Sequence, residues 1–135
     1  MPETVDSITY PTVSAPKFVD NPAAAAAFEA GHTPHIDLSL LEGVTRISVQ
    51  TSFYADHPNE LGHYFDWIDL FVADQPIAHW EGTGAVTSPY VGLMLNLAPG
   101  TEIVALAHCN LHGTWGARAT VADDEADVFS HDGIA

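Results

Sequence analysis

Basic residues are scarce in this sequence. Lys17, Arg46 and Arg118 stand against 18 acidic residues, so the formal net charge is -15. A surface of this sign repels phosphate groups and anionic lipids, which argues against nucleic acid and membrane surfaces as partners. Dense carboxylates with a single lysine are typical of proteins adapted to high salt, where self-repulsion is screened. An ordinary acidic protein is the alternative interpretation.

Cysteine and long apolar runs are also nearly absent. Cys109 is the one cysteine, which excludes an intramolecular disulfide. No run of eighteen apolar residues could span a membrane, and the beginning at residues 1–4 lacks the layout of a signal peptide. We therefore expect a cytoplasmic protein. A lone cysteine is most often a buried small side chain; a nucleophile or a metal ligand is the alternative.

The length of 135 residues, with 47% hydrophobic residues, predicts one domain over residues 1–135. Prolines among Ser and Thr predict an extended arm over residues 1–20. Asn21 and Pro22 form a helix start, and the run from Ala23 to Ala30 predicts one short helix that ends at Gly31. Residues 123–135 form an acidic tail with weak patterning.

The rest of the sequence has the period-two alternation of strands, separated by turns rich in proline and glycine. This pattern predicts an all-β fold, an immunoglobulin-like β-sandwich or barrel of about seven short strands with one short N-terminal helix. The clearest strand segments are Thr45–Phe53, Asp66–Ala73, Tyr90–Leu97, Glu102–His108 and Ala117–Val121.

Eight histidines are a high count for this length, and several stand where strands or the helix end. Donors on loops can converge at one end of a sandwich. We interpret His79 and His131 as ordinary surface or core residues, because a lone histidine is rarely a ligand. The candidate donors next to turn residues are His32, His57, His63, Cys109 and His112.

The segment Cys109–Trp115 reads CNLHGTW and carries the strongest local signal. A thiolate and an imidazole three residues apart can reach one metal through a tight turn. Zinc would require a closed tetrahedral ligand set. Blue copper would use a methionine a few residues later, where Ala117 stands, although an axial methionine is not obligatory.

This segment resembles the cysteine-asparagine-x-histidine-glycine-x-tryptophan signature of the desulfoferrodoxin and neelaredoxin family, the superoxide reductases. His57-Pro58 and His63-Tyr64 are similar to the family's two histidines six residues apart, and the segment from His32 to Asp37 is similar to the family's first ligand region. The resemblance covers roughly residues 30–116.

The resemblance implies one mononuclear iron, held by four equatorial histidines and an axial thiolate, with the sixth position open for superoxide. The implied ligands are His32, His57, His63, Cys109 and His112, and His32 is preferred to His35. The implied reaction is the one-electron reduction of superoxide to hydrogen peroxide, in which the thiolate raises electron density at iron. Asn110, Gly113 and neighbouring backbone N–H groups are candidate donors to the sulfur.

The sequence departs from the family in the residues before the first ligand. Family members place a glutamate and a lysine there, whereas this chain has Ala30 and Gly31. Glu29 and Arg118 are the candidates to assist at the open position in their place. His108 stands where the family often has tyrosine.

With one cysteine, the chain cannot build the four-cysteine rubredoxin-like domain of some family members, so we expect an external donor such as a rubredoxin. The resemblance also implies a homo-oligomer, a tetramer or a dimer. Two other functions remain open: a non-catalytic electron-transfer or metal-binding protein on the same scaffold, and a β-sandwich interaction module whose histidines bind nothing.

Overall fold

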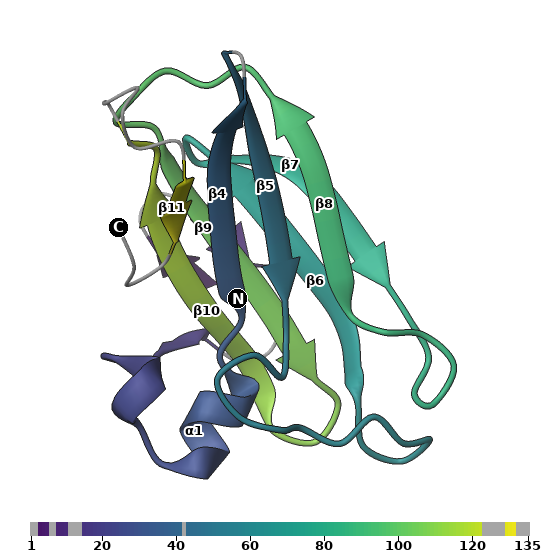
Figure 1. Ribbon diagram of the computed structural model, residues 1–135. Helices are drawn as coiled ribbons and strands as arrows, with labels where there is room; N and C mark the ends of the chain where they lie inside the picture. The colour runs from purple at the N-terminus through teal and green to yellow at the C-terminus, as the bar shows by residue number, and fades with distance from the viewer. Residues whose placement is uncertain (1–2, 6–7, 11–14, 42, 123–128, 132–135) are drawn as a thin grey trace.

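Two β-sheets face each other in the computed structural model (Figure 1), which describes the backbone of residues 3–5, 8–10, 15–41, 43–122 and 129–131. One sheet has five strands in the order β3-β10-β9-β6-β7, and the other has four in the order β11-β4-β5-β8. Neighbouring strands are antiparallel except β3, which runs parallel to β10. The strands of the two sheets are β3 (Lys17–Phe18), β4 (His35–Leu41), β5 (Val44–Gln50), β6 (Phe65–Val72), β7 (Gln75–Glu81), β8 (Tyr90–Leu95), β9 (Glu102–Cys109), β10 (Gly113–Thr120) and β11 (Phe129–His131).

The core lies between the sheets and follows from the alternation in the sequence. Side chains two residues apart along a strand share a face. Ile47 and Val49 of β5, and Ile68 and Leu70 of β6, are all buried and belong to one cluster. Leu93, Leu95 and Leu97 are partly buried and pack against this cluster, as their alternation predicts. The all-β sandwich expected from the sequence is therefore confirmed.

After the helix, three strands lie outside the expected segments, namely β4, β7 and β11. Strand β4 begins at His35, and β7 contains Pro76, which lowers the strand signal. Prediction placed the last strand at Ala117–Val121, whereas β10 begins four residues earlier at Gly113. The difference arises because Gly113 and Gly116 weaken the local signal for a strand, whereas pairing with both β9 and β3 supplies the missing stabilisation.

The predicted helix is divided into two parts. A 3-10 turn, η1, covers Pro22–Ala24, and a six-residue α-helix, α1, covers Ala27–His32. Asn21 does not cap the first part with its side chain and adopts a left-handed conformation with φ 48°. The helix continues through Gly31 to His32, so the expected end at Gly31 was one residue early. No described helix has the length and the apolar character needed to cross a membrane.

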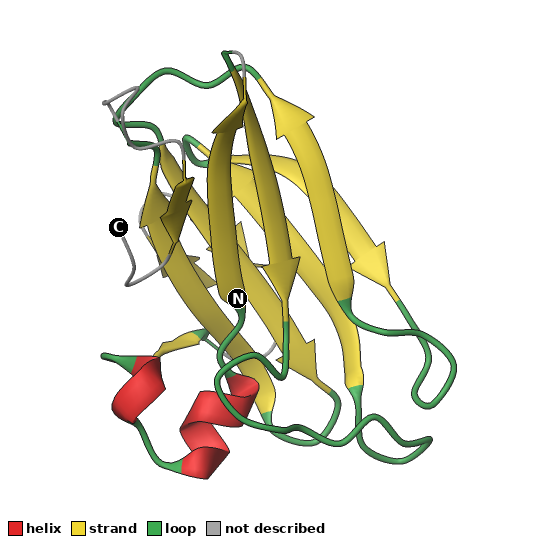
Figure 2. Ribbon diagram, in the orientation of Figure 1, coloured by secondary structure: helices red, strands yellow, loops and turns green. Residues whose placement is uncertain are grey.

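The predicted arm is partly ordered into strands. Strands β1 (Glu3–Val5) and β2 (Ile8–Tyr10) pair with each other, and β3 joins the larger sheet. In the acidic tail, β11 pairs with β4, and residues 123–128 and 132–135 lie outside the described part. Helix α1, the β5–β6 loop and the β9–β10 turn gather at one end of the sandwich (Figures 1 and 2). The predicted donors are in these segments.

Candidate metal centre

The five predicted donors come from three segments that the fold brings to one end of the sandwich. His32 is the last residue of α1, and His57 and His63 lie in the loop between β5 and β6. Cys109 is the last residue of β9, and His112 lies in the turn before β10. Strand pairing places Cys109 opposite Phe65 of β6, so the β9–β10 turn lies beside the loop that carries His63.

Four of these side chains form a cluster of possible ligands. One ligand atom from each of His32, His63, Cys109 and His112 lies within 4.8 Å of every other. His57 adjoins the cluster, because its Nε2 atom lies 3.2 Å from Nε2 of His32. The structure thus brings together all five donors that the sequence predicts.

The four imidazoles surround a common centre. Around the ring, the centroids are 4.5 Å apart for His32 and His57, and 4.7 Å for His57 and His63. His63 and His112 are 5.0 Å apart, as are His112 and His32. Across the ring, His32 and His63 are 6.4 Å apart. Four donors at the corners of such a square can hold one cation in a common plane.

Hydrogen bonds orient two of the rings toward this centre. Nδ1 of His32 donates to the carbonyl of Phe28 at 2.7 Å, and Nδ1 of His57 donates to the carbonyl of Pro58 at 2.7 Å. In the neutral rings the proton is therefore on Nδ1, and each Nε2 carries a lone pair. Two lone pairs then face each other at 3.2 Å. This contact is favourable only with a cation or a proton between them.

Burial makes a metal cation the better partner. Burial is the largest cause of a lowered pKa for both rings; for His57 it lowers the pKa to about 4, aided by the neighbouring histidines and opposed by the bond to Pro58. A proton is therefore disfavoured near neutral pH. Among the described residues, His63 adds a buried Nε2 atom that has no hydrogen-bond partner.

The thiol of Cys109 completes the donor set. It is fully buried, and its Sγ atom lies 3.8 Å from Nδ1 of His112. Burial raises the pKa of the thiol, whereas the backbone N–H groups of Leu111 and His112 donate to the sulfur and favour the thiolate. The neighbouring backbone N–H groups that were expected to donate to the sulfur are therefore those of Leu111 and His112. Imidazole nitrogens with one thiolate suit iron, copper or zinc, so the residues present fit an iron.

Aromatic side chains hold the first histidine in place. The indole of Trp115 stacks on His32 at 4.8 Å and donates to the carbonyl of His112 at 3.1 Å. The ring of Phe28 lies 4.6 Å from His32 and 5.0 Å from His112. Because Phe28 and His32 are four residues apart, one helical turn supplies both this ring contact and the carbonyl that orients His32.

The remaining histidines with described side chains lie elsewhere. His35 is buried and stacks on Phe53 at 3.7 Å. His108 pairs with Asp66 at 2.6 Å and stacks on Trp67, on the outer face of the larger sheet. His79 lies between Asp69 and Glu81. For His131 the structure describes only the backbone, in strand β11.

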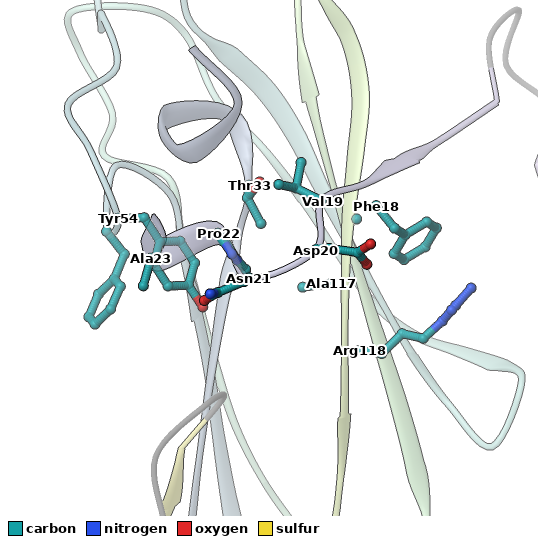
Figure 3. Close-up of a pocket in the computed structure, with 12 residues that line it drawn as sticks. Phe18, Val19, Asp20, Asn21, Pro22, Ala23, Thr33, Tyr54, Ala117 and Arg118 are labelled. Atoms are coloured by element: carbon teal, nitrogen blue, oxygen red, sulfur yellow. The ribbon is translucent and has the colours of Figure 1, made fainter. Parts of the chain in front are cut away.

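Of the two residues expected to assist at the open position, Glu29 lies on the helix that carries His32, whereas Arg118 lies away from the donors. Glu29 is exposed on α1. Arg118 lies over the ring of Phe18, with 4.1 Å between Cζ and the ring centroid, and lines a separate cavity of about 580 Å³ (Figure 3). No donor lines this cavity, and Arg118 is five positions along β10 from Gly113, which pairs with Cys109.

A cation beside the donors, Lys17, was missed by sequence reasoning. Lys17 places Nζ 5.0 Å from the ring of Trp115, the same ring that stacks on His32. Its charge contributes to the lowered pKa of His32. This contact depends on the parallel pairing of Lys17 with Trp115 across β3 and β10, which no local pattern indicates.

Comparisons with known proteins agree with this architecture. The desulfoferrodoxin family model matches residues 24–118, more than half of the chain. A protein of Methanocaldococcus jannaschii with the provisional name superoxide reductase is 35% identical over 94 residues, covering 65% of this chain and 79% of that protein. A superoxide reductase (neelaredoxin) from Ignicoccus hospitalis has 24% identity and a TM-score of 0.65, over 81% of this chain and 95% of that one. The superoxide reductase from Nanoarchaeum equitans has 23% identity and a TM-score of 0.65, and the match covers 79% of this chain and 100% of that one. The chain therefore belongs to the desulfoferrodoxin family.

Proposed function

We propose that this protein is a superoxide reductase, which reduces superoxide to hydrogen peroxide by one electron at a mononuclear iron. The observation that carries the proposal is the square of four imidazoles with the buried thiol of Cys109 beside it. A related protein of 35% identity carries the name of this activity. The proposed ligands are His32, His57, His63, Cys109 and His112.

The chain's own residues would prepare this reaction in three ways. The carbonyls of Phe28 and Pro58 keep a proton on Nδ1 of His32 and His57, so that Nε2 remains a ligand. The sulfur of Cys109 would donate electron density to an iron held here, and the N–H groups of Leu111 and His112, which donate to the sulfur, would moderate this effect. An iron held by these residues would supply the one electron that superoxide accepts, and two protons from solvent would complete hydrogen peroxide.

The first experiment is metal analysis of the purified protein, followed by rapid mixing of its ferrous form with superoxide. We expect one iron per chain, a thiolate-to-iron absorption band in the oxidised protein, and one peroxide per iron oxidised without release of oxygen. Cys109→Ser should abolish the band. A protein with no tightly bound iron, or one that releases oxygen, would contradict the proposal.

A second candidate is a non-catalytic electron-transfer or metal-binding protein. The observation that favours it is the neighbourhood of Ala30 and Gly31, which are buried and carry neither a carboxylate nor an ammonium group. Iron with the expected spectrum but no rapid oxidation by superoxide would support this second candidate.

We further propose that residues 1–135 form a single cytoplasmic domain that assembles as a homo-oligomer, a tetramer or a dimer, and that an external donor such as a rubredoxin re-reduces the iron. Sedimentation of the purified protein tests the assembly. Reduction of the ferric protein by a reduced rubredoxin tests the donor.

A further inference from the structure

Asn110, the residue between Cys109 and the rest of the turn, makes three hydrogen bonds to the loop that carries His63. Its backbone N–H donates to the carbonyl of Tyr64 at 3.0 Å. Its side-chain oxygen accepts from the backbone N–H of Tyr64 at 2.9 Å, and its side-chain nitrogen donates to the carbonyl of Gly62 at 3.1 Å. Its side chain is thus engaged with the loop, whereas Leu111 and His112 donate to the sulfur.

The residue between those two partners is His63. Gly62 and Tyr64 are its immediate neighbours, so Asn110 is hydrogen-bonded to the backbone on both sides of His63. The backbone of His63 is also paired with Glu60 in both directions, at 3.0 and 3.1 Å. Residues 60–63 therefore form a tight turn whose two ends are hydrogen-bonded to each other. Bonds that hold Gly62 and Tyr64 therefore hold the backbone from which the His63 ring extends.

Two separate segments supply the donors that this contact joins. His63 lies in the β5–β6 loop, whereas Cys109 and His112 lie at the β9–β10 turn. Between Phe65 and Trp67 the pairing of β6 with β9 is irregular, so strand pairing alone holds the two segments together only loosely at this end. The amide of Asn110 bridges them on the side of the donors.

We propose that Asn110 is a positioning residue that sets the His63 imidazole relative to Cys109 and His112. The task requires an acceptor and a donor on one short side chain, because one partner is an N–H group and the other is a carbonyl. Aspartate retains the acceptor and loses the donor, and alanine loses both. This inference rests on the proposed metal centre, and it concerns metal binding rather than turnover.

A matched control is present in the same loop. The amide of Asn59 also makes two hydrogen bonds to a neighbouring loop: it donates to the carbonyl of Thr87 at 3.0 Å and accepts from the N–H of Ala85 at 3.2 Å. Both asparagines are exposed, and Asn59 bonds to no neighbour of a donor residue. Loss of either amide should cost similar stability, whereas only Asn110 should act on His63.

The test is a titration of the full-length metal-free protein with Co²⁺. Calorimetry measures the affinity, and the visible absorption spectrum of the bound ion reports its surroundings. Asn110→Ala should weaken binding about 10-fold to 100-fold, the usual effect of losing a group that orients a ligand. It should also shift the Co²⁺ spectrum toward that of His63→Ala. Asn110→Asp should fall between the wild type and Asn110→Ala, and Asn59→Ala should retain the wild-type spectrum.

A double-mutant cycle decides whether Asn110 acts through His63. In a His63→Ala background, Asn110→Ala should weaken Co²⁺ binding less than 3-fold, because the ring it positions is already gone. An equal loss in both backgrounds, or a spectral change in Asn59→Ala as large as in Asn110→Ala, would overturn the inference. Absence of Co²⁺ binding by the wild type would instead contradict the proposed metal centre. Asn110→Asp keeps the cycle interpretable if Asn110→Ala does not fold.

Discussion

Gly31 shows how one residue limits what can stand beside the candidate metal centre. A Cβ atom added there would lie 2.8 Å from the backbone oxygen of Asp56, a shorter distance than Cβ atoms in proteins show. The neighbouring Ala30 is also buried. The position where the resemblance leads one to expect a lysine is therefore covered by the chain itself, and any side chain there requires the backbone to move.

We predict that Gly31→Ala destabilises the metal-free protein by about 1–3 kcal/mol, the usual cost of forcing an extra carbon into a packed site. Gly62→Ala is the control, because an added Cβ at Gly62 meets no atom within 4 Å. Urea unfolding of both variants measures the difference. Equal stability of the two variants would show that the contact with Asp56 relaxes at little cost.

His79 allows a prediction about pH that does not involve the metal. Its bonds to Glu81 and Asp69, in that order of effect, raise its pKa above the ordinary value of 6.5, against a smaller effect of burial. The unfolded chain lacks these partners. The stabilisation is therefore complete below pH 6.5 and is lost as the pH rises through the folded-state pKa.

We expect His79→Gln to lower the free energy of unfolding more at pH 5.5 than at pH 9. The measurement is denaturant unfolding of the metal-free wild type and the variant at both pH values and moderate salt. The effect should be modest, because His79 is exposed. A difference between the two proteins that is the same at both pH values would count against the assigned ion pairs.

Loops rather than strands carry most of the candidate ligands, and one loop supports another. The β7–β8 loop packs closely against the β5–β6 loop: a Cβ atom added to Gly84 would lie 2.1 Å from the carbonyl oxygen of Glu60 and 2.7 Å from the ring of Tyr64. The amide of Asn59 also joins the two loops, but its loss would leave the packing of Gly84 against Glu60 in place. The position of His57 and His63 thus depends on a loop that contributes no ligand.

Gly84→Ala should therefore weaken Co²⁺ binding by about 10-fold, because the Glu60–His63 turn must shift to admit the added carbon, and support of a ligand from outside the first coordination shell is usually worth this much. Val86→Ala is the control, since Val86 is in the same loop and is 76% exposed. Calorimetric titration of both variants tests the prediction. Equal affinities would show that the two loops move independently.

The whole molecule repels its proposed substrate. With a net charge of -15, the protein creates a negative potential that lowers the local concentration of superoxide at low ionic strength. The screening length falls from about 30 Å at 0.01 M salt to about 8 Å at 0.15 M. Salt should therefore weaken this repulsion.

We predict that the rate constant of the ferrous protein with superoxide rises at least 2-fold between 0.01 and 0.5 M salt. The same protein mixed with hydrogen peroxide, which is neutral, provides the control and should show little dependence on salt. Stopped-flow absorption at the oxidised-iron band measures both reactions. A rate that falls with salt would indicate that a local cation, such as Lys17, outweighs the net charge.

Local patterns were sufficient for several conclusions. Alternation in Asp66–Ala73 predicted a strand whose residues Ile68 and Leu70 are buried, because strand periodicity is a local property. The three-residue spacing of Cys109 and His112 indicated one shared centre, because a tight turn has few geometries. The family resemblance supplied the other three donors, which the structure brings into the same group.

Other features were decided only by the tertiary structure. The surroundings of His35, which begins β4 and stacks on Phe53, are one such feature. Three further features depend on the tertiary structure. They are the division of the predicted helix, the proximity of Lys17 to Trp115, and the hydrogen bonds of Asn110 to the loop of His63. Composition and periodicity are local in the sequence and determined the fold class, and short motifs together with the family resemblance that they carry determined the donors. Register and loop packing arise from long-range contacts, and these decided how the donors are held.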